Sequence, residues 1–405
     1  MRWGHQGSGK IVNNQSNPDQ KLNQNQQNQN PIQTQAPTQT SQKPEQKLSR
    51  RQFFFIIIQT QIGVGVLSIP YELHKVAKQD GWISLLIAGL LLQLVLFVLW
   101  ALARNYPELT LFQINEKLFS KWLGKFISFV YIIYFLGVGT LIILLFGRMI
   151  SLWVLPNTPL WVLALLMIAA CIYLVDGGLL IMGRVYTMFS FLLVVLILLV
   201  TYSMKEMNII YLFPILETGW GKIFTGVNKA ILSFFGFIVS LVIFPKVEGK
   251  PKDKLKTIFL AHWFVVVFYL YIVLASFTFF STKELPLVPE PLLYMLKSFE
   301  LPVIARIDLF FISIWIISVA TSYATYVYMA SIGLKEIFQT QQTGRFLIVF
   351  GMITFFITVY VGFDMKKLEF FNQAVIYSGY VFSITLPLLM LPLSFLFKKI
   401  KKGQN

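Results

Sequence analysis

Residues 59–71 read QTQIGVGVLSIPY, and this stretch decides the fold. It lies in an apolar segment that begins near Phe53, so Gly63 and Gly65 are ten to twelve residues inside that segment. At about 1.5 Å per helical residue this depth is roughly 15–18 Å, the middle of a bilayer. Two glycines flanked by Gln and Thr disfavour a continuous helix. Because lipid cannot satisfy the backbone groups that a break exposes, the pattern predicts a broken helix beside a polar cavity.

The composition is typical of a membrane protein. Of 405 residues, 56% are apolar and 13% are charged, and the mean hydropathy is +0.67. Soluble proteins usually carry about 25% charged residues. The composition therefore excludes a soluble enzyme, a disordered chain and a disulfide-stapled secreted domain, and the single cysteine, Cys171, cannot form an intramolecular disulfide.

Apolar runs with the length of a membrane-spanning helix recur from Arg51 onward. They are apolar on all faces, whereas membrane-spanning strands would alternate over about ten residues. The sequence predicts an all-α polytopic membrane protein with ten spans near 53–78, 82–104, 126–155, 160–175, 184–204, 222–245, 257–280, 306–333, 345–361 and 373–397.

The first 48 residues differ from the membrane domain predicted at 49–402. From Asn13 to Gln46, 18 of 34 residues are Asn or Gln, without apolar periodicity. Such a segment cannot bury enough apolar surface to offset the entropy of ordering, so residues 1–48 are predicted to be a disordered tail. No apolar region typical of a signal peptide follows the first basic residues.

The basic residues predict the orientation of the spans. With the N-terminus inside, the inner connections hold 20 Lys and Arg and the outer ones hold 10, which favours two cytoplasmic termini. The lysine cluster at 246–256 then lies in a cytoplasmic loop. It is interpreted as a topogenic signal, and no nucleic-acid partner is expected despite the net charge of +16.

A second break is predicted in the sixth span, where Ser233-Phe234-Phe235-Gly236-Phe237 precedes Pro245. Taken alone, Gly236 is better explained by close helix packing. Its position is equivalent to that of Gly63–Gly65 if residues 53–204 and 222–397 are two five-helix repeats. Because five is odd, the second repeat is inverted, and paired broken helices in inverted repeats indicate a ligand site at the midplane.

Several stretches together resemble the spore germination permeases, the B-type subunits of germinant receptors in the amino acid–polyamine–organocation superfamily. They are Gln59–Tyr71 followed by Asp80-Gly81-Trp82-Ile83, Phe213-Pro214 with Ser233–Gly236 and Phe244-Pro245, Pro291–Arg306 running into Asp308 and Trp315, and the basic end of the tenth span. The resemblance implies a LeuT-like 5+5 inverted-repeat fold with discontinuous helices 1 and 6. It also implies an A-type membrane subunit and a C-type lipoprotein as partners, a small germinant that is commonly an amino acid, and the spore inner membrane as location.

An amino-acid ligand makes two demands on the predicted site. Its carboxylate needs donors, which unwound N–H groups at Gly63, Val64 and Gly65, leading into Val66, would supply at a helix N-terminus. Its ammonium needs acceptors, which freed carbonyls around Ser233–Gly236 would supply. Aromatic rings at Phe235 and Phe237 are candidates to close over the ligand side chain, although most of the 38 Phe are expected to contact lipid or core.

Polar side chains in two other spans are further candidates. Ser318, Ser322 and Thr325 share a helix face with Thr321 beside it, and such hydroxyls would suit a ligand or a sodium ion. The alternative is that each hydroxyl bonds a carbonyl of the preceding turn. Tyr134, with Tyr131, is a comparable candidate in the third span.

Ionisable residues do not indicate proton-coupled transport or catalysis. No Asp or Glu is recognised near the middle of a span, which argues against a proton symporter driven by a central carboxylate. No nucleophile–base constellation or metal-spaced cluster is recognised either, so neither an enzyme nor a cofactor is expected.

The leading hypothesis is a germinant-sensing receptor subunit. The alternative is a secondary amino-acid transporter that works by alternating access, and a third class is a scaffold that keeps the fold without a ligand. The sequence leaves open the germinant, the coupled ion and the stoichiometry of the complex.

Overall fold

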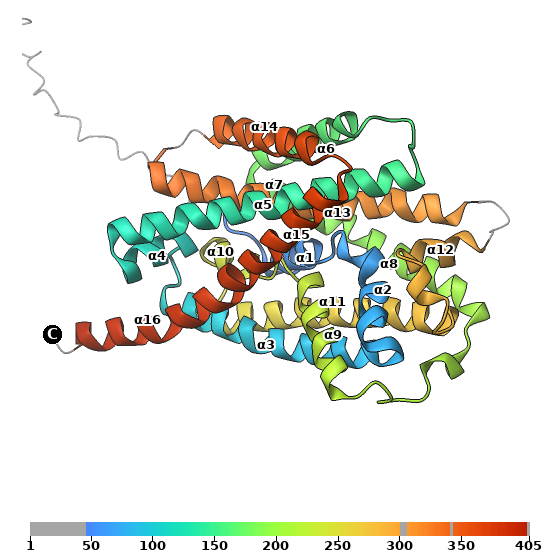
Figure 1. Cartoon of the computed structure of the whole chain (residues 1–405). Helices are drawn as coiled ribbons and strands as arrows, with labels where there is room; N and C mark the ends of the chain where they lie inside the picture. The colour runs from blue at the N-terminus through green and yellow to red at the C-terminus, as the bar shows by residue number, and fades with distance from the viewer. Residues whose placement is uncertain (1–45, 300–305, 341–342, 403–405) are drawn as a thin grey trace, which may run out of the picture. The chain divides into compact units, whose positions relative to one another are not determined.

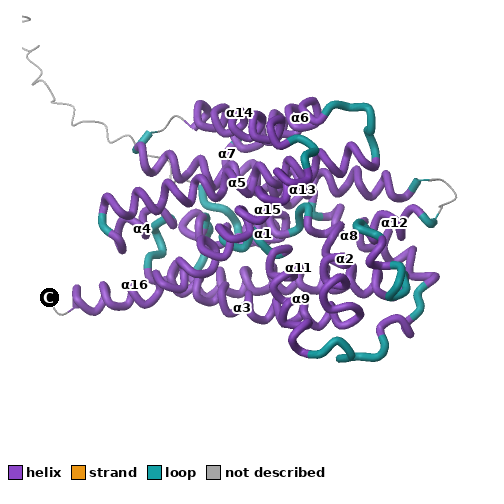
Figure 2. The backbone as a smooth tube through the Cα atoms, in the orientation of Figure 1, coloured by secondary structure: helices purple, strands orange, loops and turns teal. Residues whose placement is uncertain are grey.

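The computed structural model describes residues 46–299, 306–340 and 343–402, and the regular structure within them is helical (Figure 1, Figure 2). These ranges contain no strand beyond an isolated parallel bridge between Leu48 and Val247. Most of the predicted tail lies outside the described residues, as does part of the 291–306 motif. Leu48, the last residue of the predicted tail, is buried.

Each of the ten predicted spans coincides with one helix or one pair of consecutive helices (Figure 1). They are α1 Arg50–Gln61 with α2 Gly65–Ala77, α3 Gly81–Asn105, α5 Lys121–Trp153, α6 Leu160–Asp176, α7 Gly178–Phe189 with α8 Phe191–Ser203, α9 Trp220–Ser233 with α10 Val239–Val242, α11 Pro251–Phe279, α13 Ile307–Phe338, α14 Thr343–Val361, and α15 Met365–Gly379 with α16 Leu386–Lys402. Two connecting helices, α4 Leu111–Phe119 and α12 Pro291–Lys297, complete the named α-helices of the described residues.

Length and composition support membrane crossing for most of these segments. Seven helical stretches in the described part of the chain are long and apolar enough to cross a membrane, and α6 is a shorter apolar helix of 17 residues. The broken helices α1 and α9 are too short to qualify separately, while α2 and α3 count as one stretch. The number of ten spans therefore stays a prediction.

Both predicted helix breaks are present. Ile62–Val64 separate α1 from α2, and turns at 234–238 separate α9 from α10. The two breaks lie against each other, because a Cβ atom at Gly236 would lie 2.7 Å from the carbonyl oxygen of Thr60. Gly236 also has a φ of +118°. Gly236 therefore has both roles considered from the sequence: it lies in the helix break, and it allows the close contact with Thr60.

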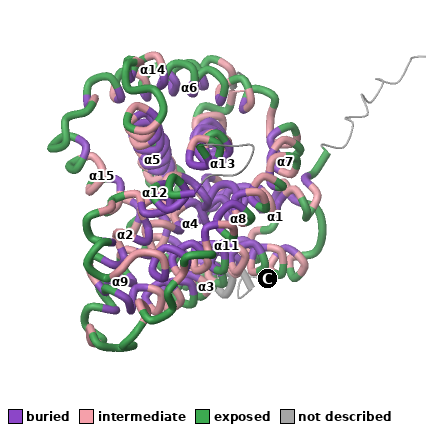
Figure 3. Tube along the Cα trace, turned by 90° about the vertical axis from the view of Figure 1, so that its right-hand side faces the viewer, coloured by how far each residue is buried: buried purple, intermediate pink, exposed green. Residues whose placement is uncertain are grey.

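The broken helices are surrounded by the others. Helix α1 packs against α11 on one side and α13 on the other, while α5 runs beside α13 and α3 beside α11 (Figure 1). Residues of α1 and α13 are mostly buried, whereas α3, α6 and α14 have exposed outer faces (Figure 3). These faces carry large apolar side chains such as Leu94, Leu166 and Phe356, which are 65–66% exposed. An apolar periphery of this kind suits lipid as its surroundings.

Replacing Gly236 by Ala should destabilise the fold. The new Cβ atom would overlap the Thr60 carbonyl, and the positive φ alone costs about 1–3 kcal/mol for a residue with a side chain. The measurement is the midpoint of thermal unfolding of the purified protein in detergent.

The matched control is Gly221→Ala, in the first turn of the same helix α9. No atom lies within 4 Å of a Cβ atom at Gly221, and alanine favours helix over glycine by up to about 1 kcal/mol. Equal midpoints for the two variants would contradict the close contact between the breaks.

Candidate functional site

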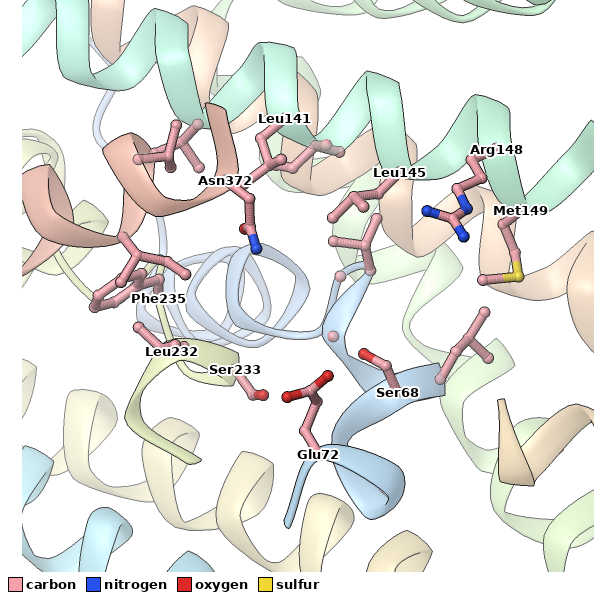
Figure 4. A pocket seen from close by; sticks show the side chains of 18 of the residues that line it. Ser68, Glu72, Leu141, Leu145, Arg148, Met149, Leu232, Ser233, Phe235 and Asn372 are labelled. Atoms are coloured by element: carbon pink, nitrogen blue, oxygen red, sulfur yellow. The ribbon is translucent and has the colours of Figure 1, made fainter. Parts of the chain in front are cut away.

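A cavity of about 610 Å³ lies beside the two helix breaks. Its wall is built from α1, α2, α5, α9, α13 and α15 (Figure 4). The part next to α5 is apolar, with Val138, Leu141, Ile142 and Leu145. The rest mixes polar side chains such as Ser68 and Asn372 with apolar ones such as Leu232 and Leu368, so the cavity suits a small molecule that has both apolar and polar groups.

Half of the predicted site residues line this cavity. They are Gly63, Val64, Gly65, Ser233, Phe235 and Ser322. The other six lie outside its lining: Val66, Tyr134, Gly236, Phe237, Thr321 and Thr325. Val66 and Phe237 are fully buried in the apolar core, and Gly236 lies against Thr60.

Side chains from other helices satisfy carbonyl groups at the end of α1 and in the break. Ser322 donates to the carbonyl of Thr60 at 3.0 Å, Tyr269 to that of Gln61 at 2.9 Å, and Trp315 Nε1 to that of Gly63 at 3.3 Å. All six residues are buried, and a Cβ atom at Gly63 would lie 3.2 Å from Ser322 Oγ. The broken segment is therefore held from α11 and α13.

The N–H groups of the same break remain available. Those of Gly63, Val64 and Gly65 donate to no acceptor among the described residues. Free N–H groups are normal at the start of a helix, and they carry the positive end of its dipole. With the nearby carbonyls already bonded, the break presents mainly donors, and this arrangement favours an anionic group.

The hydroxyls of α13 that lie outside the cavity form a separate cluster. Thr325 donates to the carbonyl of Thr321 at 2.9 Å and lies 3.1 Å from the hydroxyl of Thr60. Tyr186 donates to the same Thr321 carbonyl at 2.6 Å, and Thr321 lies within 3.1 Å of Gln59 Oε1. These bonds are the ordinary way in which hydroxyls are satisfied inside a membrane helix.

Tyr134 does not face the cavity but contacts the segment between α15 and α16. Its hydroxyl hydrogen-bonds to Ser383 at 2.9 Å, and its ring stacks on Phe382 with centroids 5.6 Å apart. Tyr131 bonds the carbonyl of Phe382 at 2.8 Å. Both partners belong to a π-helical segment, Tyr380–Thr385, between α15 and α16. Tyr134 therefore packs against the tenth segment and lies outside the cavity lining.

Charged side chains also line the cavity. Three acidic and three basic residues line it: Glu72, Glu290, Glu369, Lys75, Arg148 and Lys229. Glu72 on α2 and Lys229 on α9 form an ion pair at 3.4 Å, with 40% and 38% of their side chains exposed. Burial raises the pKa of the Glu290 carboxyl, and the positive charge of Arg148 opposes this rise.

Sequence reasoning missed Glu72, although a signal was present. Gly65, Ser68 and Glu72 are spaced i, i+3 and i+7, so they share one face of α2. Figure 4 shows Ser68 and Glu72 beside Ser233 at the same space. The expectation that no carboxylate lies near the middle of a span did not consider Glu72. Glu72 is about two turns, or roughly 10 Å, from the break rather than at the predicted midplane.

The opposite end of the molecule is closed by backbone pairing. Leu48 donates to the carbonyl of Lys246 at 2.8 Å and accepts from the N–H of Glu248 at 2.9 Å. Lys254 adds a bond to the carbonyl of Phe244 at 2.9 Å. These contacts lie at the predicted inner side, whereas Glu290 and Arg148 of the cavity lining lie at the predicted outer side.

Comparisons of sequence identify the family. A model of the spore permease family, described as "Spore germination protein", matches residues 47–395. The chain belongs to this family. Spore germination protein B2 of Bacillus subtilis (strain 168) is 27% identical over 367 residues, covering 89% of this chain and 99% of the relative. Spore germination protein GerQB of Bacillus cereus is 25% identical over 348 residues, covering 86% and 96%.

Solved transporter structures show the fold of this family member. MhsT in complex with L-phenylalanine has a TM-score of 0.65 at 14% identity, covering 87% of this chain and 90% of that one. Mhp1, a nucleobase-cation-symport-1 family transporter with bromovinylhydantoin bound, has a TM-score of 0.57 at 14% identity, covering 86% and 78%. The predicted LeuT-like fold with discontinuous helices 1 and 6 is confirmed, and the chain is an integral membrane protein.

Replacing Ser322 by Ala should loosen the break in this spore permease. The substitution leaves the buried carbonyl of Thr60 without its donor, a loss of about 1–3 kcal/mol of unfolding free energy. The measurement is the unfolding midpoint in detergent without added ligand.

The control is Ser313→Ala on the same helix. The exposed Ser313 hydroxyl bonds only the carbonyl of Leu309, one turn earlier, so its removal should cost less than about 0.5 kcal/mol. A loss for Ser322→Ala no larger than that for Ser313→Ala would show that the bond does not hold the break.

Proposed function

We propose that this chain is the germinant-sensing membrane subunit of a spore germinant receptor, and that it binds an amino acid in the cavity beside the breaks. Family membership supports the role in germination. The observation that carries the binding site is the asymmetry of the α1–α2 break, where side chains occupy the carbonyls while N–H groups stay available.

The ligand carboxylate is placed at the N–H groups of Gly63, Val64 and Gly65. A carboxylate there accepts several backbone hydrogen bonds and gains from the dipole of α2. The wall of α5 then faces the ligand side chain, with Val138 and Leu141 in reach of its apolar part.

The ligand ammonium is placed toward α9, beside Gly65. Ser233 lines the cavity there and supplies a hydroxyl oxygen, in keeping with the acceptors expected around Ser233–Gly236. Glu72 adds a negative charge to the lining of the same cavity. Its exposed pair with Lys229 is of the kind worth less than about 1 kcal/mol, so a ligand ammonium can compete for the carboxylate.

Binding in this position links the two broken helices. The ligand touches α2 through Gly65 and α9 through Ser233, and these residues already lie in contact. A ligand shifts a conformational equilibrium only through different affinities for the two states. The amino acid therefore favours an arrangement in which α2 and α9 close around it. This change is passed to the A-type membrane subunit and the C-type lipoprotein in the spore inner membrane.

Gly65→Leu should abolish the germination response while the protein stays in the membrane. A Cβ atom at Gly65 lies 3.4 Å from Ser233 Cβ, an ordinary contact, but the remaining atoms of a leucine fill the carboxylate position. Spores that carry this subunit and its partners as their sole receptor are tested with each of the twenty amino acids by the fall in optical density.

The smaller variant Gly65→Ala should reduce the response much less than Gly65→Leu does. Immunoblotting of spore membranes establishes that both variants are present. A normal dose–response curve for Gly65→Leu would refute the placement of the ligand.

Glu72→Gln should raise the amino-acid concentration needed for half-maximal response about three- to tenfold. The variant keeps the shape of the side chain and removes the charge that favours the ammonium, and tenfold corresponds to about 1.4 kcal/mol. Glu284→Gln is the control, since this exposed outer-loop carboxylate bonds Ser281 and does not line the cavity. Equal curves for both variants would remove Glu72 from the site.

A secondary amino-acid transporter remains the alternative, favoured by the cavity beside two breaks in a transporter fold. Proteoliposomes containing the purified chain separate the two functions. The receptor function predicts saturable amino-acid binding without accumulation, whereas uptake against a concentration gradient would support the transporter.

A further inference from the structure

Two buried side chains in the cavity wall have no role in the proposed binding mode. They are Gln61, the last residue of α1, and Tyr326 on α13. Gln61 is 2% exposed and Tyr326 is 1% exposed, and both line the cavity. Within the described part of the chain, neither the amide atoms of Gln61 nor the hydroxyl of Tyr326 has a hydrogen-bond partner.

The two residues flank one contact between their helices. Ser322 on α13 donates to the carbonyl of Thr60 on α1. Gln61 follows Thr60 directly, and Tyr326 lies one helical turn after Ser322 on the same face. The backbone of Gln61 is fixed by the bond from Tyr269, and the ring of Tyr326 packs against Phe135 with centroids 6.2 Å apart. Both residues therefore belong to a firmly packed region of the wall, and their polar atoms are buried in this structure.

Their combined chemistry is that of an uncharged polar subsite. The amide of Gln61 offers two N–H donors and one acceptor oxygen, and the hydroxyl of Tyr326 can donate or accept. A ligand carboxamide or hydroxyl also donates and accepts, so it is complementary to the polar group of either residue. A carboxylate would face the Gln61 oxygen with negative charge, an ammonium would find no acidic partner in this pair, and an alkyl group would leave the buried groups unsatisfied.

We propose that Gln61 and Tyr326 form a specificity subsite that selects amino acids whose side chain carries a carboxamide or a hydroxyl. This inference rests on the proposed amino-acid site, and it adds the class of side chain that the site accepts. A pocket built to bond a polar group rejects analogues that lack the group more strongly than an apolar pocket rejects an added one.

Near-isosteric ligand pairs test the subsite directly. Asparagine is compared with leucine, and threonine with valine, for binding to the purified full chain in detergent and for the response of spores that carry it as sole receptor. The polar member of at least one pair should bind at least about tenfold more tightly.

Substitutions then assign the preference to its residues. Gln61→Leu and Tyr326→Phe should each reduce the ratio of polar to apolar affinity severalfold, and Gln61→Leu should improve binding of the apolar member. Because the substitution removes buried groups that lack a partner, the unfolding midpoint of Gln61→Leu without ligand should not fall. This readout separates a change in selectivity from damage to the fold.

The chain supplies matched controls that do not line the cavity. Gln93 on α3 has an amide that likewise lacks a partner among the described residues, and Tyr323 lies one turn from Tyr326 on α13. Gln93→Leu and Tyr323→Phe should leave the affinity ratios unchanged.

The outcomes distinguish the two proposals. Equal affinities within both pairs would mean that water satisfies Gln61 and Tyr326, which overturns the subsite while the amino-acid site stands. A preference that survives both substitutions also overturns the subsite. If none of the twenty amino acids binds to the chain or triggers the spores, the proposed function fails and the subsite falls with it.

Discussion

The rest of the structure depends on how the unwound backbone at Ile62–Val64 is satisfied. Inside a membrane an unbonded backbone group costs several kcal/mol, so a broken helix persists only where protein or a ligand supplies partners. Ser322, Tyr269 and Trp315 supply donors to the carbonyls of this region from two other helices. The break in α1 therefore requires donor side chains on α11 and α13.

The same bonds give the cavity its polarity. Had the carbonyls been left exposed, the break would have attracted a cation, whereas the remaining N–H groups favour an anion. The hydroxyl cluster of Thr321 and Thr325 lies behind α1 and is saturated by Tyr186 and by the α13 backbone. Helix α13 thus holds the break through Ser322, which lines the cavity, and contacts α1 through Thr321 and Thr325, which lie outside the cavity lining.

The sequence was informative where a residue's role depends on its own segment. Apolar length located the helices, and paired glycines in QTQIGVGV located the break. Roles that depend on distant partners were beyond it. Tyr134 has the character of a site residue, yet it bonds Ser383, 249 positions away. Gln61 stood in the motif, but its unbonded amide becomes apparent only when the surrounding helices are in place. Glu72 could have been found from its spacing to Gly65, because both lie on one face of α2.

The contact of Leu48 with the residues after α10 has a mechanical consequence. It joins the start of α1 to the end of α10, while the contact of Gly65 with Ser233 joins the start of α2 to the end of α9. The four half-helices are thus coupled as two pairs, one on each side of the breaks. A rotation of one pair against the other would change backbone dihedral angles at both breaks, Ile62–Val64 and 234–238, so a movement at one break is transmitted to the other.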